Sequence, residues 1–254
     1  GFGNISAPGY RYHPAILAQA AATIGEMFPG RFWLALGSGE ALNEAITGEY
    51  WPDKEERNAR LAECVEVIRA LFAGETVTHR GRVTVIEAKL YSRPAQPVPL
   101  FGAAVTPETA ALCGKWADGF LTVGGDAENV RKVVDAFREH GGEHKPVHIQ
   151  HAVSWNRTEE AALAAALDQW APVTVGGDAA WDLRRPADFD HVARFVGADH
   201  IGESVAVSAD PGRHRGWIEA LVELKPAAVH LHCVGRNQRE FIDMAARHLL
   251  GEFD

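Results

Sequence analysis

Cysteine is scarce in this chain: Cys64, Cys113 and Cys233 lie far apart, and their spacing fits no metal-binding motif. We therefore expect no disulfide framework, and an odd, low count is typical of the reducing cytoplasm, where we place the protein. Basic residues are also in the minority, with 25 Lys and Arg against 34 Asp and Glu and a net charge of −9. This balance argues against a nucleic-acid partner. The chain also lacks an apolar run of membrane-spanning length and a visible signal peptide, so we expect no membrane partner.

What is present suits one large core. The chain has 254 residues, 46% of them hydrophobic, and no linker-like run divides it, so we expect a single domain over residues 1–254. The chain opens at Gly1 without Met, directly in a segment that looks like the end of a strand. We therefore expect that preceding sequence is missing.

Strand-like and helix-like segments alternate along the chain. Continuous apolar runs predict strands at 31–36, 98–104, 119–123, 147–155 and 227–234, besides the strand end at 1–5. Apolar residues at helical spacing predict helices at 12–27, 51–73, 107–116, 127–140, 158–170, 211–224 and 238–250, and residues 75–86 predict a hairpin. This α/β alternation is typical of a parallel sheet covered by helices. It fits an open sheet, or a (β/α)₈ TIM barrel that lacks its first strands.

Residues 171–208 interrupt this alternation. The segment contains Gly176-Gly177 and Pro186, and it predicts only short helices near 188–195 and 199–207. Insertions of this length often form lids or substrate loops.

The most informative stretch is Gly37-Ser38-Gly39-Glu40-Ala41-Leu42-Asn43-Glu44, between a strand and a helix-forming sequence. Gly37 and Gly39 have no Cβ, so the backbone there can approach a flat ligand closely. Ser38 is a candidate N-cap, and Glu40 is expected to point at the ligand. The third glycine of a dinucleotide fingerprint is absent. Taken alone, Glu40 is equally well explained as an acid that complements the helix dipole.

Several segments together resemble a known family. They are Arg11–Ala20, Phe28–Phe32, Gly37–Glu44, the hairpin, 98–107, Ala117–Gly119 and Gly235–Gln238. The chain resembles the bacterial-luciferase-like superfamily, in the branch that includes glucose-6-phosphate dehydrogenases dependent on the deazaflavin coenzyme F420. The resemblance implies a luciferase-like (β/α)₈ barrel in which Gly1–Ile5 ends the third strand. About the first three strand-helix units are then absent, together with the Asp-His pair that the family carries on its second strand.

The resemblance also implies an F420-dependent oxidoreductase, with the cofactor at the carboxyl-terminal mouth of the barrel. Two alternatives stay open: a monooxygenase that uses FMN, and a non-catalytic truncated barrel that binds a ligand. A small-molecule substrate is expected, and family members often form homodimers.

Site residues follow from the same resemblance. Glu40 matches the carboxylate proposed to exchange a proton during hydride transfer, and it is the one catalytic residue that we can name. The positions that match cofactor contacts are Asn4, Ile5, Ala7, Ser38, Gly39, Asn43, Val105, Thr106, Glu108 and Thr109. Among these, Asn4-Ile5 matches a non-proline cis peptide of the family, and Ala7 lacks the hydroxyl of a contacting Thr. The turn before Pro107 matches the site of the cofactor phosphate tail, where free helix N–H groups bind anions.

On the substrate side, cationic and polar positions of the sugar-phosphate enzymes are replaced. Val123 and Asp126 stand for a Thr and a Lys, and Glu203 lies near the position of a second Lys. Carboxylates repel a phosphate, so we expect a neutral alcohol, aldehyde or ketone in place of glucose 6-phosphate.

Four histidines, His148, His151, His230 and His232, alternate on two strands, so that each pair is expected to face one side of its strand. No carboxylate motif accompanies them. We expect core or mouth residues here and no metal site.

Overall fold

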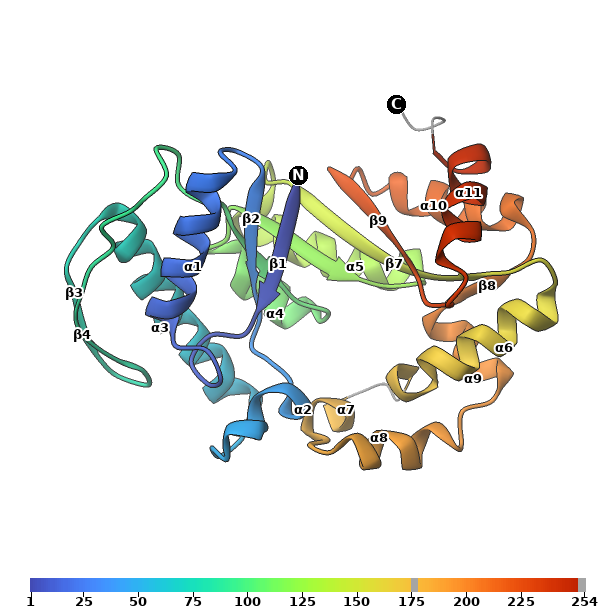
Figure 1. Ribbon diagram of the computed structural model, residues 1–254, viewed down its shortest axis with the longest axis horizontal. Coiled ribbons are helices and arrows are strands. Elements are labelled where there is room, and N and C mark those ends of the chain that lie inside the picture. Colours follow the sequence, from blue (N-terminus) through green and yellow to red (C-terminus); the bar gives the residue numbers. More distant parts are fainter. Residues whose placement is uncertain (175–177, 251–254) are drawn as a thin grey trace.

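The computed structural model describes residues 1–174 and 178–250. Its centre is a parallel sheet of seven strands, in the order β1-β2-β5-β6-β7-β8 with β9 also paired to β7. The strands are β1 (Phe2–Ser6), β2 (Phe32–Leu36), β5 (Leu100–Ala103), β6 (Gly119–Val123), β7 (Val147–Trp155), β8 (Ala206–Ser208) and β9 (Ala228–Cys233). Among the described strands, β1 has β2 as its one neighbour, so the sheet forms an open half-barrel (Figure 1). The α/β prediction of a partial barrel is confirmed.

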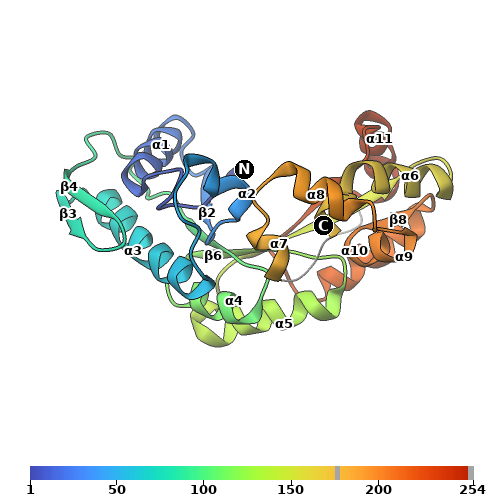
Figure 2. The same cartoon turned by 90° about the horizontal axis from the view of Figure 1, so that it is seen from below.

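Helices connect successive strands and cover the convex side of the sheet, where Figure 2 shows α3, α4 and α5 in one arc. The long helices are α1 (Pro14–Met27), α3 (Lys54–Ala73), α4 (Pro107–Gly114), α5 (Ala127–Phe137), α6 (Glu159–Trp170), α10 (Pro211–Val222) and α11 (Gln238–His248). The hairpin that the sequence predicts is formed by β3 (Val77–Arg80) and β4 (Thr84–Ala88), and it packs beside α3.

Side-chain caps fix where these helices begin. Asp53 accepts a hydrogen bond from the backbone N–H of Glu56 at the start of α3, and Thr106 accepts one from Thr109 at the start of α4. Each cap satisfies an N–H group that has no partner inside the helix. Because α4 follows β5 almost directly, its first turn lies at the carboxyl edge of the sheet, where a barrel fold places its site.

The two faces of the sheet are packed differently. On the convex face, the fully buried Phe120 stacks on Phe137 of α5, with ring centroids 4.6 Å apart. On the concave face, Trp33 stacks on Phe101 at 5.1 Å, and Leu121 joins this cluster. The convex face therefore contacts the helices, and the concave face forms the inside of the half-barrel.

The expectation that each histidine pair faces one side of its strand is wrong for β7. His148 lies on the concave face, where its Nδ1 is 3.2 Å from Nε2 of His230. His151 is fully buried on the opposite face, and its Nδ1 lies 3.2 Å from the carbonyl oxygen of Gly124. The reason is geometric: residues three apart on a strand point to opposite faces.

The irregular segment differs from its prediction at three elements, η3 (Ala171–Thr174), α7 (Asp178–Asp182) and β8. It also contains α8 (Pro186–Ala193) and α9 (Ala198–Ser204). The helix expected at 199–207 ends at Ser204, and β8 pairs with the far end of β7. A strand of three residues is too short to show the period of two on which strand recognition depends.

Two further differences are local. The helix expected at 127–140 ends at Phe137, and a π-helical turn η2 (Arg138–Gly142) follows, with Gly141 at a φ of 107°. Beyond β2, the chain forms the short helix α2 (Ala41–Glu44) and the 3₁₀ turn η1 (Ala45–Thr47). Within residues 1–174 and 178–250, no helix combines the length and apolar character that crossing a bilayer requires.

Candidate active site

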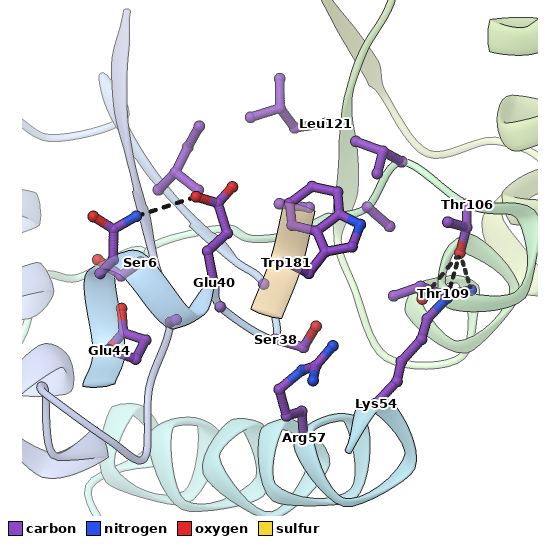
Figure 3. A pocket seen from close by; sticks show the side chains of 18 of the residues that line it. Ser6, Ser38, Glu40, Glu44, Lys54, Arg57, Thr106, Thr109, Leu121 and Trp181 are labelled. Carbon is purple, nitrogen blue, oxygen red and sulfur yellow. Dashed lines mark hydrogen bonds between the residues drawn. The ribbon is translucent and has the colours of Figure 1, made fainter. Parts of the chain in front are cut away.

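A pocket of about 310 Å³ opens at the carboxyl edge of the sheet. The ends of β1, β2, β5 and β6 form its floor and walls, and α2, α3 and α4 border it. One residue of α7, Trp181, reaches into it from the irregular segment (Figure 3). The pocket therefore joins parts of the chain that are as much as 176 positions apart, from Ile5 to Trp181.

The glycine turn after β2 is shaped by contacts with the protein itself. Gly39 has a φ of 85°, which side chains rarely adopt, and a Cβ there would lie 3.0 Å from Cγ of Glu44 and 3.1 Å from Cβ of Ala7. Gly39 is thus required by conformation and packing, in addition to lining the pocket. The prediction that Ser38 caps the helix is wrong, because Glu40 holds the extended N-cap conformation and makes no side-chain cap bond.

Glu40 stands at the pocket mouth. Its Oε2 accepts a hydrogen bond from the Asn43 side-chain amide at 3.2 Å. Burial, and then the charge of Glu44, raise the pKa of the Glu40 carboxyl. The residue as a whole is exposed, so solvent screens part of the effect of Glu44 on it. A carboxyl with a raised pKa keeps its proton to a higher pH than usual, as a proton donor must.

Glu44 lies one helical turn further and is almost fully buried, with 3% of its surface exposed. Its carboxylate accepts hydrogen bonds from the backbone N–H of Arg11 at 3.2 Å and from the Arg11 guanidinium at 3.5 Å. The pKa of Glu44 is raised overall: burial raises it, and the charge of Arg11 and its N–H bond offset only part of that rise. Two carboxylates with different surroundings therefore share one wall of the pocket.

The opposite wall is cationic. Lys54 Nζ donates a hydrogen bond to the Thr106 hydroxyl at 3.2 Å, beside the first turn of α4. Arg57 is buried; its guanidinium donates to the carbonyl of Pro52 at 2.8 Å, but within the described part of the chain its Nε has no hydrogen-bond partner. Figure 3 shows Lys54 and Arg57 rising from α3 along this side. Two cations and free helix N–H groups together suit a bound anion.

Asp182, next to Trp181, holds the irregular segment in place beside the pocket. Trp51 donates its indole N–H to Asp182 at 3.0 Å, and the Arg57 guanidinium lies 3.8 Å from the same carboxylate. These contacts hold α7 against the segment between α2 and α3. The lid that the sequence predicts at 171–208 thus supplies a wall of the pocket through Trp181.

Most residues that the sequence nominated lie in this pocket. Those that line it are Ile5, Ala7, Ser38, Gly39, Glu40, Asn43, Val105, Thr106, Thr109 and Val123. Four others lie outside its lining: Asn4, Glu108, Asp126 and Glu203.

Each of these four has another local environment. The Asn4 side chain accepts a hydrogen bond from the Ser6 hydroxyl, and Asp126 caps α5 by accepting from two backbone N–H groups. Glu108 lies exposed in the first turn of α4, and Glu203 lies exposed on α9.

The cis peptide expected at Asn4-Ile5 is absent, since no described peptide bond is cis. Asn4 and Ile5 instead pair in regular parallel register with Leu34 and Ala35 of β2, which requires extended backbone.

Sequence reasoning missed five residues that shape the pocket: Arg11, Glu44, Lys54, Arg57 and Trp181. One signal was available for Lys54 and Arg57. The capped start of a helix at Asp53 follows the Glu40 turn closely, so the first turn of that helix returns to the same edge of the sheet.

Comparisons with known proteins agree with this architecture. The family model described as luciferase-like monooxygenase matches residues 2–227. An F420-dependent glucose-6-phosphate dehydrogenase of Microbacterium testaceum is 31% identical over 97% of this chain and 76% of its own length. The enzyme of the same name from Amycolatopsis mediterranei is 33% identical, over 97% and 77%. The chain thus spans about three quarters of these relatives.

Solved structures show the same fold. An F420-dependent secondary alcohol dehydrogenase in complex with an F420-acetone adduct superposes with a TM-score of 0.86 and 29% identity, over 96% of this chain and 77% of that one. The F420-dependent tetrahydromethanopterin reductase of Methanopyrus kandleri gives a TM-score of 0.80 over 99% and 83%, and at 20% identity it supports the fold alone. From the matched family model, the half-barrel and these relatives, we conclude that the chain belongs to the luciferase-like monooxygenase family.

Proposed function

We propose that this protein is an oxidoreductase that uses the deazaflavin coenzyme F420 and a small organic substrate. The observation that carries the proposal is one pocket with a carboxylate of raised pKa, Glu40, on one wall and the Lys54 and Arg57 cations on the other. Relatives named as F420-dependent dehydrogenases, 31% to 33% identical to this chain, support the choice of cofactor.

The pocket residues fit such a cofactor. A deazaflavin has a flat ring and a long acidic tail, and the buried Nε of Arg57, unpaired among the described residues, is a donor that an anionic tail can satisfy. Lys54 and the first turn of α4 would hold the phosphate, with Thr106 and Thr109 beside it. The ring would lie toward Ala7, Ser38 and Asn43. When bound, the cofactor supplies or accepts a hydride.

We propose a neutral alcohol or ketone as the substrate. Trp181, Leu121 and Val123 give the remaining wall of the pocket an apolar lining. Among the described residues no cation lines this wall, and Asp126 and Glu203 lie outside the lining, so the described wall offers a sugar phosphate no second anion site. The superposed secondary alcohol dehydrogenase, 29% identical, contains an acetone adduct and is consistent with this class.

In this proposal Glu40 holds or receives the proton that accompanies hydride transfer, and the Asn43 amide orients its carboxyl group. The test is Glu40→Gln, with acetone and reduced F420 followed by absorbance. We expect turnover to fall by about 10²–10⁴-fold, the usual contribution of a positioned acid or base, with little change in cofactor affinity. Glu26→Gln, which alters an exposed carboxylate of α1 outside the pocket lining, is the matched control and should leave turnover unchanged.

Equal turnover in Glu40→Gln and the unmodified protein would refute the assigned role. Binding of FMN in preference to F420 would refute the cofactor. Binding of F420 without turnover on any small ketone or alcohol would instead favour a ligand-binding protein. We also retain the cytoplasm and a homodimer as proposals, which fractionation and light scattering test.

A further inference from the structure

The carboxylates of Glu40 and Glu44, at the two ends of α2, have unequal surroundings. Glu40 is the extended N-cap of α2 and Glu44 is its last residue, and both line the pocket. Glu40 stands at the pocket mouth, whereas Glu44 is buried beneath Gly39, whose Cβ position lies 3.0 Å from Glu44 Cγ. The role proposed for Glu40 makes no use of Glu44. A buried acid beside a candidate proton donor requires an explanation.

Glu44 has a cation of its own. The loop between β1 and α1 brings Arg11 to it, with a backbone N–H at 3.2 Å and a guanidinium at 3.5 Å. The Arg11 side chain is two-thirds buried and that of Glu44 is 98% buried, so water screens this pair weakly. Such a pair favours the ionised form of Glu44.

Glu40 has no comparable partner among the described residues. Apart from Arg11, the described cations that line the pocket come from α3, and each is already engaged. Lys54 donates to Thr106, and Arg57 donates to a backbone carbonyl and faces Asp182. The partner of Glu40 is the neutral amide of Asn43, which stabilises a carboxylate less than a cation does.

We infer that Glu44, held ionised by Arg11, is a positioning residue that confines the exchangeable proton of this carboxylate pair to Glu40. The role given to Glu44 rests on the proposed function of Glu40. The test of that role does not depend on the proposed function. Neighbouring carboxylates resist simultaneous ionisation, so the one with the better counter-charge ionises first and the other retains the proton. The causes of the two pKa shifts agree with this order: burial raises the pKa of both carboxyls, Arg11 offsets that rise at Glu44, and the charge of Glu44 adds to it at Glu40.

The test is a pH titration of the full chain, without cofactor, followed by NMR of ¹³C-labelled glutamate carboxyl groups. Glu40→Gln identifies the Glu40 signal by its loss. In Glu44→Gln the negative neighbour is gone, so the midpoint of Glu40 should move to lower pH. In Arg11→Gln, Glu44 loses its counter-charge and takes up the proton first. The Glu44 midpoint should then rise while that of Glu40 falls.

Glu26→Gln is again the control, and it should leave the Glu40 midpoint unchanged. A purely structural role for Glu44 would lower the melting temperature of Glu44→Gln without moving that midpoint. An unchanged Glu40 midpoint in both Glu44→Gln and Arg11→Gln overturns the inference. If Glu44→Gln does not fold, the result for Arg11→Gln decides by itself. Because these titrations need no cofactor, their outcome is independent of whether Glu40→Gln abolishes turnover.

Discussion

Lys54 offers a sharp test of how the pocket binds an acidic cofactor. Its ammonium donates to the Thr106 hydroxyl at 3.2 Å, and that hydroxyl caps the first turn of α4. A phosphate seated on this turn therefore lies within reach of Lys54. The perturbation is Lys54→Met, which keeps most of the side-chain length and removes the charge.

The expected size of the effect follows from the position of Lys54. A hydrogen bond to a charged group contributes about 1.5–3 kcal/mol, and because Lys54 is only partly buried the lower end applies. About 1.5 kcal/mol corresponds to a roughly tenfold increase in Kd for F420. The dependence of Kd on salt should also weaken, since one screened charge is lost.

The assay is a fluorescence titration with F420 and, in parallel, with the deazaflavin that lacks the phosphate tail. Affinity for the tail-less compound should not change in Lys54→Met. Lys132→Met is the matched control, because Lys132 is an exposed lysine paired with Glu128 on α5. An equal loss of affinity for both compounds would show that Lys54 acts on the fold of the pocket and would refute the reasoning.

Two other predictions concern the apolar wall of the pocket and the glycine turn after β2. Trp181→Ala removes part of the apolar wall, so KM for acetone should rise while bulkier ketones gain in relative kcat/KM. Steady-state kinetics with a series of ketones checks this. An equal change in kcat/KM for all ketones would contradict it. Gly39→Ala should destabilise the protein to urea by about 1–3 kcal/mol, because it forces a positive φ and a Cβ against Glu44. Gly48→Ala shares the positive φ but meets no atom within 4 Å, so an equal loss there would exclude crowding as the cause at Gly39.

The sequence predicted the parts of the site that depend on local patterns. The turn from Ser38 to Asn43 and the helix start at Pro107 were identified because glycines and prolines act within a few residues. Ser38 was assigned as the cap in error. The backbone stays non-helical for two more residues, so the N-cap position is that of Glu40.

The parts that were missed depend on contacts between distant segments. Trp181 reaches the pocket because α7 is bonded to Trp51, 131 positions from Asp182. Arg11 pairs with Glu44 across 33 positions. Neither contact follows a helical or strand period, and charge alone does not distinguish a buried arginine from a solvated one.

The fixed position of the Arg57 side chain affects how quickly and how selectively the pocket can bind a charged ligand. Its guanidinium stacks over the Trp51 ring at 4.7 Å and is held by the Pro52 carbonyl. An arginine side chain that becomes fixed loses about 2 kcal/mol of rotamer entropy, and for Arg57 this loss occurs on folding and not on ligand binding. A ligand that reaches Nε therefore meets a cation already fixed in place. Preorganisation of this kind lets the pocket discriminate by charge at first encounter, before any side chain has to rearrange.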